Sequence, residues 1–306
     1  MGGLAFLWHE SDGWHAQRPL GPTGIGASRD DALADLRAAL HDPQRSSDRE
    51  PVSEVSLVPG RVEQQAPEQA RRERTRSIDD LDIEQCLLIS PDAFESMLAQ
   101  QCPLATHFPT GPAFSQHAVG ALYDWPIGSS FFRRSRILQV SSTRYALEFR
   151  SSWLPVGFGV FAFDGNRLLA LHRRTENLRV VLSAEQRRLD EADPEDMARF
   201  LAGNLGDDGM LRHDLVTLDS LHQMEASGEY LLDPHELWRI ASALAPASIE
   251  AHAGGWTVGF ASLFGWSVEK QVVVDWRIDV SRRFEVTARK RIVSERIFRS
   301  TPIVME

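Results

Sequence analysis

The stretch Val272-Val-Val-Asp-Trp-Arg-Ile-Asp-Val280 alternates apolar and polar side chains along most of its length. The apolar positions continue at Phe284, Val286 and Ala288, after Ser281-Arg-Arg283. Because successive side chains of a strand point to opposite faces, this pattern predicts an antiparallel hairpin. One face of the hairpin is expected to be buried, and the outer face is expected to be basic.

A second hairpin is predicted farther up the chain. Val160-Phe-Ala-Phe163 and Asn166-Arg-Leu-Leu-Ala-Leu171 are typical of strands, and Asp164-Gly165 lies between them. An Asp-Gly pair is favoured in two-residue type I′ turns, in which both central residues need a positive φ. The sequence therefore predicts a type I′ hairpin here.

Three helices are predicted from one local signal: a capping residue, then proline, then an acidic residue in the first turn. The starts are Ser90-Pro-Asp, Asp193-Pro-Glu and Asp233-Pro-His-Glu. The cap oxygen accepts a free N–H, proline lacks one, and the carboxylate lies at the positive end of the helix dipole. Because strands occur in hairpins with helices between the hairpin blocks, the predicted fold class is α+β.

The first 42 residues predict a small module of strand, strand and helix. Apolar runs at 4–8 and 13–17 flank a Ser-Asp-Gly turn, and the Ala- and Leu-rich run 29–40 has helical spacing. The module resembles the small fold of HicB-type antitoxins through Glu10-Ser-Asp-Gly-Trp14 and Gly26-Ala-Ser-Arg-Asp-Asp-Ala-Leu33. The family's Pro-Asp-Leu-Pro-Gly turn is missing. The resemblance covers about one seventh of the chain and implies a binding or regulatory module.

Three glycines precede the helix of this module, at Gly21, Gly24 and Gly26. Their order differs from the dinucleotide-binding fingerprint, and no Walker lysine follows. Asp30 and Asp31 occupy the first turn, where a bound phosphate would lie beside two carboxylates. We interpret these glycines as structural.

The predicted organisation has three parts. Residues 43–77 are rich in Pro, Gln, Ser, Arg and Glu and contain almost no aromatic side chains. Such a segment buries too little apolar area to offset the entropy of ordering, so it is predicted to be a flexible linker. It separates the small module, 1–42, from a main α+β domain, 78–306.

Composition indicates a cytoplasmic protein. The 306 residues include only two cysteines, Cys86 and Cys102, and neither a signal peptide nor an apolar run of membrane-spanning length is evident. The net charge of −10 disfavours nucleic acid and anionic membranes as partners of the whole molecule. The charge is uneven, however: segment 120–180 holds nine arginines and four acidic residues, whereas 181–237 holds four arginines and fourteen acidic residues.

Two groups of residues are candidates for a functional site. His107, His117 and Asp124, with Cys102 nearby, lie in a Pro- and Gly-rich stretch and are of types that bind zinc or catalyse hydrolysis. Their spacing matches no metal motif, so no metal or cofactor is assigned. The second group is Arg133, Arg134 and Arg136, whose guanidinium groups suit phosphate or an acidic partner surface. Internal pairing with the acidic segment 181–237 is the alternative that we favour for them.

Three function classes follow from these features. A small tethered module, a linker and the lack of a recognisable catalytic set favour a non-enzymatic interaction or adaptor protein of a bacterial cytoplasmic assembly, with another protein as partner. The first alternative is a hydrolase, metal-dependent or not, that uses the 102–124 loop. The second is a nucleic-acid-binding protein that uses the basic strands 133–150 and 276–299.

Overall fold

The computed structural model shows two compact units, Met1–Asp124 with Leu138–Leu168, and Trp125–Ile137 with Leu169–Glu306. The predicted linker, 43–77, lies outside the described residues. The structure describes residues 3–19, 21–41, 83, 86–105, 119–125, 130–142, 144–147, 149–150, 157–205, 214–227, 230–231, 233–265 and 270–299.

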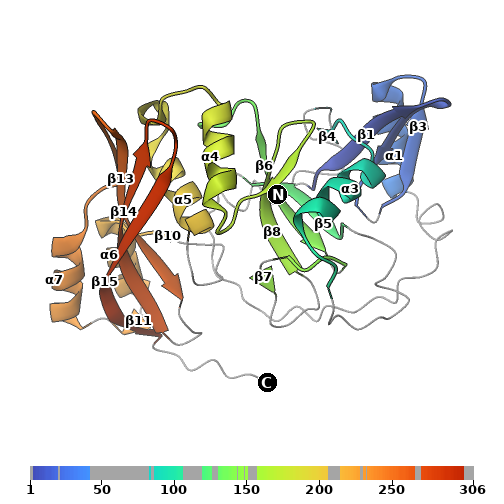
Figure 1. The fold of residues 1–306 in the computed structure, drawn as a ribbon. Coiled ribbons are helices and arrows are strands. Elements are labelled where there is room, and N and C mark those ends of the chain that lie inside the picture. The colour runs from blue at the N-terminus through green and yellow to red at the C-terminus, as the bar shows by residue number, and fades with distance from the viewer. Residues whose placement is uncertain are drawn as a thin grey trace. The chain divides into compact units, whose positions relative to one another are not determined.

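Helices and strands are mixed along the chain, and most strand pairs are antiparallel, so the predicted α+β class is confirmed (Figure 1). The helices are α1 (Arg29–His41), α3 (Pro91–Gln101), α4 (Thr175–Ala184), the 3₁₀ turn η3 (Leu189–Glu191), α5 (Pro194–Leu205), α6 (Leu218–Ser227) and α7 (Pro234–Ala243). The strands are β1 (Ala5–Glu10), β2 (Gly13–Gln17), β3 (Thr23–Gly26), β4 (Cys86–Leu87), β5 (Ala121–Asp124), β6 (Arg136–Ser142), β7 (Phe149–Arg150), β8 (Gly157–Phe163), β9 (Leu168–Ala170), β10 (Asp214–Leu215), β11 (Tyr230–Leu231), β12 (Ser248–His252), β13 (Gly255–Gly265), β14 (Lys270–Ser281) and β15 (Val286–Arg299). Among the described residues, no helix has the length and apolar character needed to cross a membrane.

The first unit begins with the predicted strand–strand–helix module, which the structure confirms. Its sheet has the order β3-β2-β1-β4, in which β4 runs parallel to β1 and the other pairs are antiparallel. Ala5 and Leu7 of β1 pack against Leu33 and Leu36 of α1 in one buried cluster that also contains Cys86. The sheet therefore takes its fourth strand from beyond the predicted linker.

Two of the three glycines before α1 lie where strand β3 touches the helix. A Cβ atom on Gly24 would lie 2.2 Å from the backbone N of Leu36 and 2.4 Å from the carbonyl O of Ala32. A Cβ atom on Gly26 would lie 2.4 Å from the backbone N of Ala32. Because real Cβ atoms do not approach backbone this closely, the spacing between β3 and α1 accounts for both glycines.

The three predicted helix starts are confirmed. Ser90 Oγ accepts the N–H of Ala93 at the start of α3, at 3.3 Å, and Asp193 and Asp233 cap α5 and α7 through their carboxylates. Helix α3 then packs within the first unit through Phe94. Its ring lies 5.4 Å from that of Phe6 in β1 and 6.1 Å from that of Phe163 in β8, measured between ring centroids.

The predicted hairpin at 160–171 is present, but the predicted turn type is wrong. β9 pairs with β8, and the N–H of Asp164 donates to the carbonyl of Arg167, so the central residues are Gly165 and Asn166. Of these two residues only Gly165 has a positive φ, 94°. A type I′ turn requires a positive φ at both central residues, whereas a glycine at the first central position is typical of a type II′ turn. The Asp164 carboxylate accepts the N–H groups of Asn166 and Arg167, which holds Asp164 just outside the turn.

The second unit is built on a six-stranded sheet with the order β10-β13-β14-β15-β11, with β12 also pairing with β13. The predicted hairpin forms β14 and β15, with Val280 opposite Val286. Phe284 does not continue the strand. It lies in the turn with φ of 59°, and its ring stacks on Trp256 with 5.7 Å between centroids.

Helices cover both faces of this sheet (Figure 1). On one face, Ala261, Val273 and Val293 pack with residues of α6 and α7. Trp276 and Phe260 alternate with these positions and are buried on the opposite face, where α4, α5 and η3 lie. The central strands are thus buried on both faces near one end, which explains the unbroken apolar run at the start of β14.

The predicted basic outer face of the hairpin carries alternating charges. Arg291 contacts Asp275 at 3.0 Å, and Arg289 is ion-paired with Asp279. Thr257 Oγ1 donates to Asp279 Oδ1 at 2.8 Å, and this hydrogen bond, followed by the Arg289 contact, lowers the pKa of the Asp279 carboxyl below its ordinary value.

Replacing Thr257 with valine is expected to raise the pKa of Asp279, because the ionised carboxylate loses one of its donors. A carboxyl whose pKa is lowered in the folded state stabilises the fold at pH values above its ordinary pKa. This contribution to stability disappears as the pH falls through the lowered pKa. The variant should therefore lose stability at neutral pH, and the loss should shrink in acid. NMR titration of the Asp279 carboxyl carbon measures the shift directly, and an unchanged pKa would contradict the assignment.

Candidate functional site

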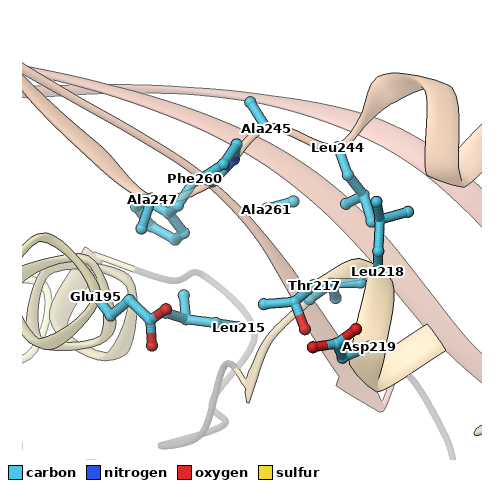
Figure 2. A pocket seen from close by; sticks show the side chains of 12 residues that line it. Glu195, Leu215, Thr217, Leu218, Asp219, Leu244, Ala245, Ala247, Phe260 and Ala261 are labelled. Carbon is cyan, nitrogen blue, oxygen red and sulfur yellow. The ribbon is translucent and has the colours of Figure 1, made fainter. Parts of the chain in front are cut away.

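A cavity of about 270 Å³ opens at the edge of the six-stranded sheet in the second unit. Residues 215–219, 244–247 and 260–261 line it, together with Glu195 of α5. Figure 2 shows the side chains of these segments around the opening. Nine of the twelve lining residues are apolar and three are polar.

The cavity lies where the strand that pairs with the outer edge of β13 changes from β12 to β10. β12 pairs with β13 up to Gly259, and β10 pairs with Ser262 and Leu263. Phe260 and Ala261 lie between the two strands, where only the N–H of Val216 reaches the carbonyl of Ala261, at 3.0 Å. Phe260 and Ala261 at this interruption both line the cavity.

The apolar wall comes from two short segments that join helices to strands. Leu244, Pro246 and Ala247 follow the end of α7 and lead into β12. Val216 and Leu218 lie on the other side, where β10 passes into α6. Leu218 is 52% exposed at the rim, so apolar surface continues out of the cavity.

Among the described residues that line the cavity, three have polar side chains, Glu195, Thr217 and Asp219, and all three are exposed. Thr217 caps α6, because its Oγ1 accepts the N–H of Ser220 at 3.1 Å while Ser220 Oγ accepts the N–H of Thr217 at 2.8 Å. Glu195 lies 3.5 Å from Arg199 on the next turn of α5. The carboxylates of Glu195 and Asp219 remain available as hydrogen-bond acceptors at the lower edge of the cavity in Figure 2.

The predicted catalytic group is only partly described. His107 and His117 lie outside the described residues. Cys102 is buried at the end of α3, where its N–H donates to the carbonyl of Leu98, and Asp124 ends strand β5 with its side chain exposed. The hydrolase alternative therefore remains a prediction.

The arginine group lies in a loop that is held by one buried carboxylate. Glu185, only 4% exposed, accepts the backbone N–H groups of Arg133, Arg134 and Ser135 at 2.7–3.2 Å. The Arg134 guanidinium donates to the carbonyl of Ala184 and to the side chain of Gln186, at the end of α4. Arg133 and Arg134 are exposed, whereas Arg136 is half-buried in β6. The loop is thus connected to the acidic segment 181–237 mainly through backbone.

Among the described residues, one cluster brings three potential metal ligands together, at Glu10, Asp12 and His15 in the β1–β2 hairpin. His15 Nε2 and Asp12 Oδ1 are 2.8 Å apart, and this hydrogen bond is the first cause of the lowered pKa of the Asp12 carboxyl. Trp8 Nε1 donates to Glu10 at 2.8 Å and its ring stacks on His15. These contacts account for the three side chains without an ion.

The cavity was not predicted from the sequence. Its wall consists of Leu, Val, Ala and Pro side chains, which have no distinctive spacing. The one local signal is Thr217-Leu-Asp-Ser220, which resembles a capping pattern and predicts only the start of α6.

The chain matches no protein-family model, no curated protein and no solved structure. The resemblance of the first 42 residues to HicB-type antitoxins therefore remains a prediction.

Proposed function

We propose that the chain is a non-enzymatic interaction protein, an adaptor of a bacterial cytoplasmic assembly. In this proposal the cavity of the second unit receives an apolar side chain of a protein partner. The observation that carries the proposal is the cavity itself, which combines a mainly apolar wall with a volume of about 270 Å³.

The volume supports a side chain as the occupant. Pockets for cofactors and drug-sized ligands are commonly about 300–1,000 Å³, so this cavity lies below that range. Single aromatic or aliphatic anchors that enter small desolvated pockets dominate the energetics of many protein interfaces. The apolar rim at Leu218 would extend such a contact beyond the cavity.

The chemistry of the cavity also supports binding. Its described polar groups are two exposed carboxylates and a threonine hydroxyl that is already used as a helix cap. Among the described residues, neither histidine nor cysteine lines the cavity. Nucleophilic catalysis would need an activating base beside the hydroxyl, and acid–base catalysis by two carboxyls depends on a water-poor setting for at least one of them.

N-acetyl-tryptophanamide is expected to bind the cavity with a dissociation constant of about 1 mM, the strength of a small apolar fragment. Methyl NMR spectra should then show saturable shifts at Val216 and Leu244. Replacing Ala247 with tryptophan, which fills the cavity, should abolish these shifts. Replacing Ala226 with tryptophan, on the exposed side of α6, is the matched control and should leave them unchanged. Absence of shifts at the cavity methyls in the unmodified protein would refute the proposed role.

A further inference from the structure

We propose that one partner is a second copy of this chain, and that Trp238 of each copy enters the cavity of the other. This inference rests on the proposed role of the cavity as an acceptor for an apolar side chain. It commits to a reciprocal contact between two second units.

Trp238 is an unusual surface residue. It lies on α7 and is 73% exposed, the highest exposure of any large hydrophobic side chain in the described part of the chain. The other face of α7 is packed, because Ile240 is buried in the sheet cluster and Glu236 is buried against Ser294 of β15. The indole is therefore presented to solvent by a helix that is held in place, as is typical of an interface anchor.

The exposed indole and one wall of the cavity lie on neighbouring parts of the chain. Helix α7 ends at Ala243, and the next four residues, 244–247, form one wall of the cavity. At 1.5 Å per residue, Trp238 lies about 9 Å along the helix axis from Leu244. In a two-fold symmetric dimer the same contact forms twice, with the Trp238 side chain of each copy in the cavity of the other.

The cavity also offers an acceptor for the indole N–H. A buried tryptophan needs a hydrogen-bond partner for Nε1, and the carboxylates of Glu195 and Asp219 face the opening (Figure 2). The same pairing occurs twice in the part of the chain that the structure describes. Trp8 Nε1 donates to Glu10 at 2.8 Å, and Trp256 Nε1 donates to Asp190 at 2.9 Å.

The charges around the anchor complement those around the cavity. His235 lies one helical turn before Trp238, and Arg239 follows Trp238 directly. Both side chains are exposed. Arg239 is ion-paired with Glu236 but keeps 55% of its side chain exposed. In the proposed dimer the exposed part of the Arg239 guanidinium approaches the carboxylates at the rim of the partner's cavity, which favours this contact over one between like charges.

Sedimentation velocity of the full chain over a range of concentrations tests the inference. The unmodified protein should show a monomer–dimer equilibrium, and both Trp238→Ala and Ala247→Trp should weaken it at least tenfold. Ile292→Ala removes another exposed apolar side chain of the same unit and should leave the equilibrium unchanged. Circular dichroism and methyl NMR spectra confirm that each variant remains folded.

Mixing the two variants makes the test specific. Trp238→Ala keeps the cavity and lacks the anchor, whereas Ala247→Trp keeps the anchor and lacks the cavity. Each variant alone has no complete contact, but a mixed dimer has one, so mixing should restore part of the association. A protein that stays monomeric at about 0.5 mM, or a dimer that Trp238→Ala does not weaken, overturns the inference. Binding of N-acetyl-tryptophanamide in that case would still support the cavity as an acceptor for another protein, whereas its absence would remove both proposals.

Discussion

Replacing Glu185 with alanine is expected to lower the free energy of unfolding of the second unit by about 3 kcal/mol. The Glu185 carboxylate is buried and accepts three consecutive backbone N–H groups from residues 133–135. Hydrogen bonds to a charged acceptor contribute more than neutral ones, and here alanine leaves several donors without a partner at once. The loop would also lose the contact that connects it to the end of α4.

Chemical denaturation of the full chain, with hydrogen exchange measured over residues 130–136, checks this expectation. Exchange in this loop should become much faster in Glu185→Ala. Glu185→Gln should also be destabilising, because its amide NH₂ would face backbone donors where an oxygen is needed. Glu225→Ala, which removes an exposed carboxylate from α6, serves as the control and should change stability by less than about 0.5 kcal/mol. Unchanged protection of the loop in Glu185→Ala would show that the carboxylate does not hold it.

Replacing Gly24 with alanine is expected to separate strand β3 from helix α1 and to destabilise the first module by about 3 kcal/mol or more. The added Cβ atom would lie within 2.2–2.7 Å of backbone atoms of Ala32 and Leu36. Backbone cannot move aside as the end of a flexible side chain can. The helix must therefore shift as a whole, which opens the cluster of Ala5, Leu7 and Leu33.

Gly120→Ala is the matched control in the same unit, because its Cβ atom would lie 3.4 Å from Ser141 Oγ, an ordinary contact. Hydrogen exchange of residues 5–41 should accelerate strongly in Gly24→Ala and stay unchanged in Gly120→Ala. Fluorescence of Trp14, which packs against the module core, would report the same opening. If these amides are as well protected from exchange in Gly24→Ala as in the unmodified chain, the close approach of β3 and α1 does not account for the glycine.

The elements that sequence reasoning predicted correctly share one property, which is that their signal is local. The caps at Ser90, Asp193 and Asp233 act on N–H groups two or three residues away. The alternation in β14 reports the faces of a single strand. Signals that depend on exact φ and ψ angles predicted less well. The Asp164-Gly165 pair predicted a turn centred on these two residues, but the central residues are Gly165 and Asn166.

The candidate functional site depended on contacts between distant parts of the chain. Glu185 and Arg133 are 52 residues apart. The opposite charges of segments 120–180 and 181–237 predicted that the two regions pair, but not that one buried carboxylate accepts the backbone N–H groups of the loop. The cavity joins residues from α5, the start of α6, the end of α7 and β13, each of which is unremarkable on its own. Exposure is likewise a tertiary property, so the exposed position of Trp238 was recognised only in the folded chain.

Local residue order was therefore sufficient for the class of fold, the starts of three helices and the two main hairpins, because backbone capping and strand alternation are decided within a few residues. The pairing of β4 with β1, the carboxylate that holds the arginine loop and the cavity beside α7 were decided only by tertiary structure. These features arise when separate segments are buried together, and burial is not encoded at any one position.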